Sequence, residues 1–226
     1  MTQPGPAGSP PGIGAPRRPG LPGRAAQAAR NDEVILRAAR DVFIADPDAP
    51  VSAVAQRAGV GISALYRRYQ GKEDLLRQLC HQGLLRFIAI AEQAGTDPDG
   101  WQAFAAFLAG VVDADVHSLT VHLAGTFTPT EQMNADAMTA AALGEALLAR
   151  AAASGRLRPG VVSGDVTLIL EGCAAIRLPD PDRSRVLRTR YLALLLDGLQ
   201  VTSGALPGPA PRDGELNWRW SREPTR

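Results

Sequence analysis

The sequence predicts an all-α fold. A three-helix N-terminal domain with a helix-turn-helix, residues 24–72, precedes a larger all-helical domain, residues 73–203. Apolar residues recur at the three- and four-residue spacing of amphipathic helices in both regions, and no segment shows the alternation of a strand. In the first region, residues 52–72 form two short helical patterns separated by a glycine turn. A chain of 226 residues is long enough to bury the cores of one small and one larger domain.

The two ends of the chain are predicted to lack a packed core. Residues 1–23 contain seven Pro and six Gly with almost no large apolar side chains, which is a composition typical of disorder. Arg17 and Arg18 belong either to a solvated tail or to a basic arm that reaches into a minor groove. Residues 204–226 are predicted to form a flexible tail, in which the WRW sequence at 218–220 is either a partner-binding segment or plain tail.

The first predicted helix lies between Arg24 and Ala45, where apolar residues recur on one face. That stripe consists of Ile35, Ala38, Ala39, Val42 and Phe43. The helix is followed by a turn at residues 46–50, because the two prolines there cannot continue a helix interior. The stripe predicts that this helix packs across the two short helices that follow.

The helix-turn-helix is predicted from the residues that punctuate it. Ser52 follows a proline and a valine and is predicted to cap a helix that ends at Gly59, which can adopt the left-handed conformation without a Cβ clash. The second helix runs from about Ile62 to Tyr69, buries Leu65 with one edge of each tyrosine, and turns small and basic side chains outward. Such a pair places its second helix in the major groove of DNA.

The stretch AGVGISALYRRYQGKEDLL resembles the signature of the TetR family of bacterial repressors. The matching positions are the glycine turn at Gly59, the pair at 65–66, the aromatic Tyr69 and the Lys-Glu pair at 72–73. The segment around ILRAARDVF resembles the first helix of that family, and the resemblance covers about residues 24–85. Gly61 and the alanine at position 64 stand where many members have Ser or Thr.

The resemblance implies two sets of DNA-binding residues. The phosphate-contacting set is Ser52, Tyr66 and Lys72, and the groove-facing set is Ile62, Ser63, Ala64, Arg67 and Arg68. The backbone N–H groups that open at Gly61 can also meet a phosphate. Either arginine could bond a guanine through paired hydrogen bonds or contact a phosphate. The alternative interpretation is that the arginines are solvated helix charges and that Tyr66 is a core residue.

The distribution of charge agrees with a DNA-binding head. Residues 24–72 hold eight basic and five acidic residues, a net charge of +3, whereas residues 73–226 hold fourteen and eighteen, a net charge of −4. Only one of the 24 basic residues is a lysine. Because abundant Arg, Ala, Gly and Pro is typical of a GC-rich bacterial genome, a single surface arginine carries little weight.

The larger domain is predicted to begin with a long helix that opens at Lys72 after the break at Gly71, where the resemblance implies hinge-like behaviour. Asp97 and Pro98 are predicted as the N-cap and first residue of the next helix. The other predicted helices run from Thr128 to Ala153, from a Ser163 cap to Pro179, and from an Asp182 cap to about Val201.

A ligand cavity in the larger domain is one interpretation of its aromatic and methionine residues. The candidate wall consists of Trp101, Phe104, Phe107, Phe127, Met133 and Met138, with His117, His122, Thr126 and Glu171 as polar contacts. The same residues at helical spacing are also typical of a plain core. Asp113 and His117 lie four residues apart and could share a helix face, but two ligands without a third do not define a metal site, so we expect no metal and no cofactor.

The last predicted helix is apolar on two sides, which indicates a subunit interface. Leu192 and Leu196 form the side that we expect to face a second copy, together with Ile169 and Cys173 of the preceding helix. The resemblance implies a four-helix bundle across a two-fold axis. Such a homodimer would favour a palindromic operator on double-stranded DNA.

These features predict a dimeric, sequence-specific transcriptional regulator, a repressor that a small apolar or amphipathic ligand releases from its operator. The alternative is a DNA-binding regulator without a small-molecule effector, controlled by a protein partner or by abundance. An enzyme is not expected, because the three histidines are scattered and no nucleophile elbow, phosphate-binding loop or HExxH motif is present. Two cysteines, no apolar run of membrane-spanning length and no signal peptide predict a cytoplasmic protein without membrane partners.

Overall fold

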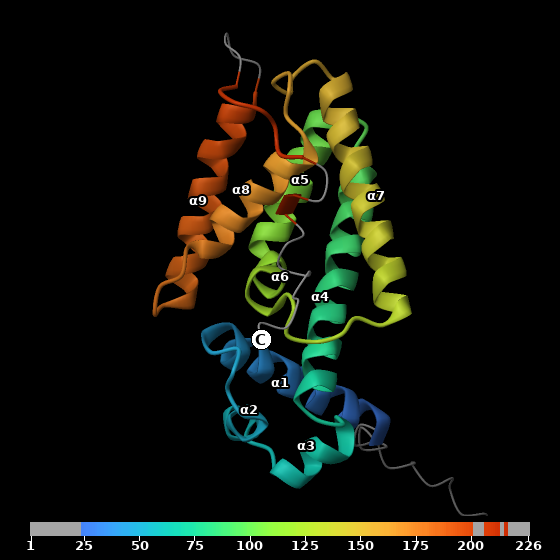
Figure 1. The fold of residues 1–226 in the computed structure, drawn as a ribbon, viewed down its shortest axis with the longest axis vertical. Helices are drawn as coiled ribbons and strands as arrows, with labels where there is room; N and C mark the ends of the chain where they lie inside the picture. Colours follow the sequence, from blue (N-terminus) through green and yellow to red (C-terminus); the bar gives the residue numbers. More distant parts are fainter. Residues whose placement is uncertain (1–23, 201–205, 213–214, 217–226) are drawn as a thin grey trace, which may run out of the picture.

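The computed structural model describes residues 24–200, 206–212 and 215–216, with the side chains of residues 24–30 excepted. The disordered tail predicted at 1–23 and most of the tail predicted at 204–226 lie outside these residues. Within the described chain the regular structure consists of nine α-helices, a short 3-10 turn at 215–216 and one isolated bridge between Leu157 and Gln200. The predicted all-α fold is therefore confirmed, and Figure 1 shows a small three-helix head below a larger helical body.

The head consists of α1 (Arg24–Ala45), α2 (Val51–Ala58) and α3 (Ile62–Arg68). Its core is built around Phe43 of α1, Val54 of α2 and Leu65 of α3, all with no exposed surface. Gly59 ends α2 with φ 67° and ψ 29°, as the sequence predicts, and the next N–H donates to the Ala55 carbonyl at 3.0 Å. α1 therefore crosses the helix-turn-helix and holds its two short helices together (Figure 1).

The predicted cap of α2 is wrong by two residues. Pro50, with φ −73° and ψ 153°, is the N-cap, and Ser52 lies in the first turn of the helix without capping it. Proline already has the extended geometry that an N-cap needs, and its carbonyl accepts from Ala53 N–H at 3.0 Å. Ser52 is consequently free to expose its hydroxyl.

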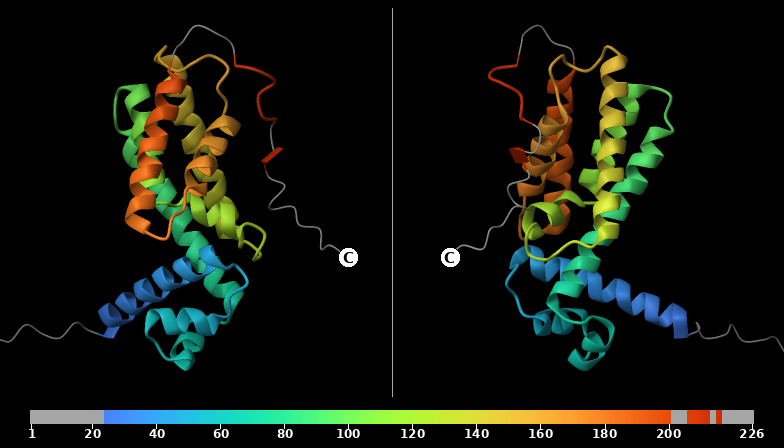
Figure 2. Two further views of the ribbon diagram at one scale, coloured as in Figure 1. Left: turned by 90° about the vertical axis from the view of Figure 1, so that its left-hand side faces the viewer. Right: turned by 45° about the vertical axis from the view of Figure 1, so that its right-hand side comes forward.

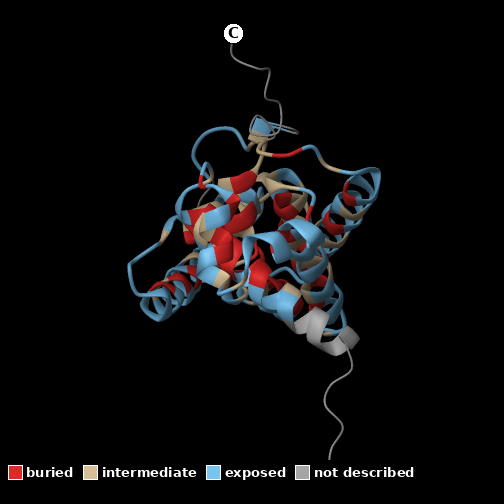
Figure 3. Cartoon of the chain, turned by 90° about the horizontal axis from the view of Figure 1, so that it is seen from below, coloured by how far each residue is buried: buried red, intermediate tan, exposed pale blue. Residues whose placement is uncertain are grey.

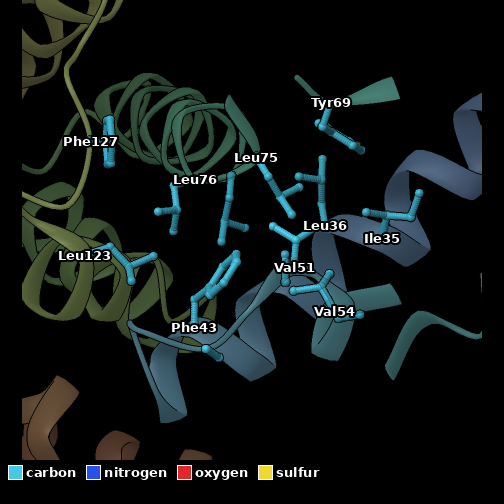
Figure 4. Close-up of a cluster of buried hydrophobic side chains, with 14 of the residues drawn as sticks. Ile35, Leu36, Phe43, Val51, Val54, Tyr69, Leu75, Leu76, Leu123 and Phe127 are labelled. Carbon is cyan, nitrogen blue, oxygen red and sulfur yellow. The ribbon is translucent and has the colours of Figure 1, made fainter. Parts of the chain in front are cut away.

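One long helix, α4 (Lys72–Gly95), runs from the head into the body (Figure 1). Its first half places three leucines, Leu75, Leu76 and Leu79, in the head core, and its second half places Ala91 and Ala94 in the body core. In Figure 4, Leu76 lies between Phe43 of the head and Leu123 and Phe127 of the body. The head core is therefore continuous with the lower end of the body.

The body contains α5 (Gly100–Asp113), α6 (His117–Leu123), α7 (Glu131–Ala153), α8 (Ser163–Ala175) and α9 (Pro181–Leu199). α5 is the central helix: it packs against α4, α7, α8 and α9, as the two views of Figure 2 illustrate. Its buried side chains are Trp101, Ala103, Phe104, Phe107, Leu108, Val111 and Val112. These residues form the centre of the second hydrophobic core.

Several predicted helix starts in the body are displaced by two residues. The N-caps are Asp99 rather than Asp97, Thr130 rather than Thr128, and Asp180 rather than Asp182. In each case the capping oxygen accepts a backbone N–H two or three residues ahead, at 2.9 Å from Gln102 in the first case. The sequence offers two candidate caps within one turn at all three sites, and periodicity alone does not distinguish them.

α6 and the boundaries of α8 were not predicted correctly. α8 has Val162 as its N-cap, because the Asp165 carboxylate accepts the Val162 N–H at 2.9 Å, and it ends at Ala175 rather than near Pro179. α6 is separated from α5 by Asp115, which has φ 50°. No single helix in the described chain is long and apolar enough to cross a membrane; α5 and α6 pass that test only as a pair bent by 57°.

Candidate nucleic-acid interface and ligand cavity

The exposed face of α3 carries the predicted groove-facing residues. Ile62, Ser63, Ala64, Arg67 and Arg68 are exposed, and Gly61 before them is exposed as well. Tyr66 is 55 % exposed, which rules out the alternative of a core residue, whereas Tyr69 takes the core position with 1 % exposure. Seen from below in Figure 3, exposed residues cover this end of the molecule around a buried interior.

The two arginines of α3 differ in their contacts. The Arg68 Nε donates to Asp32 Oδ1 at 2.8 Å, and its Nη2 bonds Asp32 Oδ2 on α1. The carboxylate accordingly raises the pKa of the Arg68 guanidinium above its ordinary value. No ion pair of Arg67 occurs within the described part of the chain.

Lys72 lies at the junction of α3 and α4. Its ammonium is 5.5 Å from the centre of the Phe43 ring, which places the charge at the edge of the head core. Gly71 precedes it with φ 136° and ψ −169°, a conformation that favours glycine. Ser52, in the first turn of α2, is exposed on the same domain.

A cavity of about 630 Å³ lies in the body between α4, α6 and α7. Its lining residues are Cys80, Gly83, Leu84, Phe87, Val116, His117, Leu119, Thr120, Phe127, Pro129, Met133, Asn134, Ala137 and Ala140. None of these described residues is an aspartate, glutamate, lysine or arginine. Burial raises the pKa of the Cys80 thiol to about 12, so this side chain is neutral at physiological pH. The wall therefore suits an uncharged, mainly apolar molecule with a few hydrogen-bonding groups.

A second cavity of about 530 Å³ lies between α7, α8 and the C-terminal segment that contains Pro211 and Leu216. It shares Phe87, His117 and Ala140 with the first cavity. Phe87 stands edge-on to Phe107, with ring centres 5.1 Å apart. The shared residues form a partition between two neighbouring chambers.

Three of the predicted ligand contacts, His117, Phe127 and Met133, line the first cavity. His117 also lines the second, together with Phe107. Trp101 and Phe104 line neither cavity and lie in the body core.

The remaining predicted contacts line neither cavity. Met138 is 75 % exposed on α7 and faces away from the core. His122 Nδ1 is 2.8 Å from the Ser118 carbonyl oxygen, and the Thr126 hydroxyl donates to the Leu123 carbonyl at 2.7 Å. Both polar groups thus contact backbone carbonyls of their own helix or the turn that follows it. Glu171 is half-buried on α8.

The α4 wall of the first cavity was missed, although its sequence carries a signal. Cys80, Gly83, Leu84 and Phe87 recur at the spacing of one helix face, and they point toward α6 and α7. Because α6 was not predicted, the sequence offered no opposite wall for this face of α4, and no cavity could be placed between them. Thr120 was missed for the same reason.

Two of the predicted dimer-interface residues belong to the core of their own chain. Leu192 is 3 % exposed and Cys173 is 1 % exposed, and burial raises the pKa of the Cys173 thiol to about 11. Ile169 and Leu196 are half-buried against the same core. The apolar side chains that α8 and α9 expose are Leu168, Val186, Tyr191 and Leu194. Leu192 and Cys173 therefore offer little surface to a second copy, whereas Ile169 and Leu196 stay partly exposed.

The considered metal pair does not share a helix face. Asp113 ends α5 and forms an ion pair with Arg185 at 2.6 Å, whereas His117 begins α6 beyond the turn at Asp115. No group of three His, Cys, Asp or Glu side chains suited to a metal ion occurs among the described residues.

Asp115 connects the head to the body. Its carboxylate accepts from Arg40 of α1 at 2.6 Å and from Arg188 of α9 at 2.7 Å, and the Ser118 hydroxyl also bonds it. Arg188 is 8 % exposed along its side chain and also donates to the Ile176 carbonyl at 2.9 Å. Nearby, burial lowers the pKa of the Arg177 guanidinium. One carboxylate thus joins three helices from both domains.

Thr128 forms a second connection, between the first cavity and the start of α4. Its N–H donates to Glu73 Oε1 at 3.1 Å, and its carbonyl accepts from Arg77 Nε at 3.1 Å. The N–H bond lowers the pKa of the Glu73 carboxyl. Because Phe127 and Pro129 on either side of Thr128 line the cavity, the cavity wall is tied directly to the first turn of α4.

A helix-turn-helix head with an exposed basic second helix, joined to a larger helical body, defines a DNA-binding transcriptional regulator. Residues 35–79 match the family model for bacterial regulatory proteins of the tetR family, and residues 97–201 match that for the C-terminal domain of SbtR-like transcriptional regulators. The chain belongs to the TetR family, and the resemblance seen in its sequence is confirmed.

Solved structures of the family share this fold. The TetR regulator SCO0520 from Streptomyces coelicolor is 28 % identical, with a TM-score of 0.51 over 76 % of this chain and 99 % of that one. PfmR from Thermus thermophilus is 21 % identical, with a TM-score of 0.53 over 74 % of this chain and 99 % of that one. LfrR from Mycobacterium smegmatis, solved in complex with proflavine, is 23 % identical, with a TM-score of 0.51 over 77 % of this chain and 99 % of that one. No curated protein matches the chain.

Proposed function

We propose that this protein is a dimeric transcriptional repressor that a small, uncharged and mainly apolar molecule releases from a palindromic operator. The observation that carries the proposal is the cavity of about 630 Å³ whose wall, through Thr128, is tied to the first turn of α4. A void of this kind fits a regulator with a small-molecule effector, whereas a compact body without one would favour a regulator controlled by a protein partner or by abundance. The repressor would act in the cytoplasm, where bacterial DNA is found.

In this proposal α3 enters the major groove. Ile62, Ser63, Ala64 and Arg67 face base edges, while Ser52, Tyr66 and Lys72 contact phosphates on either side. The exposure of Tyr66 supports this arrangement, because an aromatic side chain that is 55 % exposed leaves its hydroxyl available to a phosphate. Two such heads in a dimer would read two half-sites about one helical turn apart or a multiple of it.

The effector is proposed to bind in the first cavity. Its described wall is apolar except for a few neutral groups, of which Thr120 and Asn134 can donate or accept hydrogen bonds. A ligand with a full charge would be desolvated there without a partner, at a high cost in free energy. LfrR, which shares this fold, was solved in complex with proflavine, and this supports the idea that a protein of this fold can bind a small molecule.

Release would follow from movement of the cavity wall. A ligand that displaces Phe127 or Pro129 also displaces Thr128, which lies between them and is bonded to Glu73 and Arg77. These two residues are in the first turn and a half of α4, directly after the joint at Gly71. A shift there changes the spacing of the two recognition helices, so that DNA and effector bind different states of one protein.

The dimer is proposed to form through the exposed apolar side of α8 and α9. Val186, Tyr191 and Leu194 of α9, with Leu168 of α8, place large apolar side chains on the surface of neighbouring helices. Large apolar side chains exposed on neighbouring helices are typical of a subunit interface.

The proposal is tested by selecting bound fragments from a random DNA pool with the full chain at fixed salt, and then screening uncharged apolar compounds for release of the selected fragment. We expect one inverted repeat to be enriched. Ala140→Phe, which fills space shared by both cavities, should bind that repeat but respond weakly to a releasing compound. Met138→Phe is the control, because its side chain lies on the exposed face of the same helix.

The outcomes separate the two forms of the proposal. Enrichment of an inverted repeat that no uncharged compound releases would favour a regulator controlled by a protein partner or by abundance. Equal responses from the Ala140→Phe and Met138→Phe variants would place the effector elsewhere in the body. Failure to enrich any sequence would contradict sequence-specific DNA binding by this chain.

A further inference from the structure

Asp32 lies in an unusual place for an acidic residue, beside the C-terminal end of α3, the helix proposed to face DNA. It lies on α1, 36 residues before Arg68 in sequence, and the two side chains meet across the head. The Asp32 side chain is 20 % exposed, whereas the Arg68 side chain is 56 % exposed. A negative group that is partly shielded from water therefore stands beside the surface that must approach polyanionic DNA.

The geometry of this pair decides what Arg68 can do. Both carboxylate oxygens are used, one by Nε and one by Nη2, so the contact is a bidentate fork. An arginine uses the same donor edges to contact a phosphate or to bond a guanine. As long as the pair holds, Arg68 cannot offer that edge to DNA. Arg67, one residue earlier, has no ion pair within the described chain and offers its guanidinium freely.

We infer that Asp32 competes with DNA for Arg68 and thereby lowers the affinity of the head for DNA of arbitrary sequence. Non-specific binding comes almost entirely from the neutralisation of phosphates by basic side chains, so withdrawing one guanidinium weakens that mode directly. A repulsive element that acts on unwanted partners is a common source of specificity. Asp32 thus weakens non-specific binding without contacting any base.

The inference concerns DNA binding alone and does not depend on an effector or on release. It is tested with the full chain and a short mixed-sequence duplex, by fluorescence anisotropy over a range of salt. Asp32→Asn keeps the size of the side chain but removes its charge. We expect this variant to bind the duplex about three- to tenfold more tightly near 0.1 M salt, with a salt slope steeper by about 0.9, the contribution of one further phosphate contact.

A matched control is available in the same domain. Asp41 of α1 forms an ion pair with Arg57 of α2 at 2.9 Å, away from α3. Asp41→Asn raises the net charge by the same amount but leaves the Arg68 pair intact. We expect its salt slope to stay close to that of the unmodified protein. An equal steepening in both variants would show a general charge effect and would overturn the inference.

Arginine variants test the same idea without altering Asp32. Because Arg68 is already engaged, Arg68→Ala should change non-specific affinity much less than Arg67→Ala does. In the Arg68→Ala background the gain from Asp32→Asn should disappear. If Asp32→Asn still raises the affinity for DNA in the Arg68→Ala background, Asp32 acts only through its electrostatic repulsion of DNA. If Asp32→Asn alone binds DNA more weakly than the unmodified protein, Asp32 positions Arg68 for DNA. Either result contradicts competition, and thermal unfolding of each variant verifies that the head remains folded.

Discussion

At the scale of single residues, sequence patterns predicted which side chains α3 exposes but not the state in which each is held. The sequence predicts that Arg67 and Arg68 both lie on the exposed side of α3, yet among the described residues only Arg68 meets a carboxylate, that of Asp32 on α1. Tyr66 and Tyr69 are the same residue type three positions apart. The packing of the head core against α1 decides that Tyr69 is the buried one. Tertiary contacts of this kind cannot be derived from local spacing.

Lys72 is predicted to contact a phosphate, and the Lys72→Ala variant tests this. We expect weaker binding to all DNA sequences alike and a salt slope reduced by about one, because a single phosphate contact is lost. The ammonium lies over the Phe43 ring, so a small loss of thermal stability is also expected. The measurement is a salt titration with an operator duplex and a mixed-sequence duplex. A changed preference between the two would place Lys72 in the groove instead.

Glu73 should make the stability of the protein depend on pH in the acid range. Its carboxyl has a lowered pKa in the folded state, chiefly because it accepts the Thr128 N–H. A lowered folded-state pKa gives stability that is present above the ordinary glutamate pKa and is lost as the pH falls through the folded value. Glu73→Ala should therefore lower the unfolding midpoint at neutral pH and converge with the unmodified protein in acid.

The control for that experiment is Glu33→Ala. Among the described side chains, Glu33 forms an exposed pair with Arg37 one turn away at 2.9 Å, so its removal should shift the neutral-pH midpoint very little. Parallel midpoint curves for Glu73→Ala and the unmodified protein down to acid pH would contradict a role for the ionised carboxylate.

At the scale of helices, patterns located the elements well and their ends less well. α1 and the C-terminal end of α7 agree with the predicted residues, because each end is marked by a change in composition or by a glycine with positive φ such as Gly155. N-caps were displaced by two residues wherever two Asp or Thr residues lay within one turn. The missed helix α6 is only seven residues long, too short to give a clear periodicity. Its absence from the prediction concealed the cavity.

The two sides of α9 give a prediction in which neighbouring leucines behave oppositely. Leu192→Ala should cost about 2–5 kcal/mol of unfolding free energy, because it opens a void in a core where this side chain is 3 % exposed. Leu194→Arg places a charge on a side chain that is 62 % exposed and should yield a folded monomer. Light scattering and denaturant unfolding measure the two effects. A Leu194→Arg protein that stays dimeric would exclude this side of α9 as the interface.

At the scale of the whole molecule, the head and body are joined by charge as well as by apolar packing. Asp115 bonds Arg40 of the head and Arg188 of the body, and it does so from a backbone with φ 50°, a conformation that Asn tolerates better than most residues. Asp115→Asn therefore removes the charge without adding backbone strain. We expect a loss of about 1–3 kcal/mol, since two partly buried guanidinium groups lose their common partner.

The measurement for this variant is denaturant unfolding followed separately by a head probe and a body probe. A common, lowered midpoint is expected, because the apolar contacts of α4 still couple the two regions. An unchanged midpoint would show that the charge of Asp115 makes no net contribution to the free energy of unfolding.

The shared helix α4 also bears on the engineering of hybrid regulators, in which the head of one protein is grafted onto the body of another. A cut just before residue 73 follows the end of the DNA-binding motif, but it removes Leu75, Leu76 and Leu79 from the core that holds α1, α2 and α3 in place. A graft that keeps the donor's α4 through Leu79 preserves this core, yet it carries foreign side chains into contact with Leu119, Leu123 and Phe127 of the recipient. A working hybrid is therefore expected to need α4 through Leu79 from the donor of the head, together with the donor's residues at positions 119, 123 and 127 that pack against it.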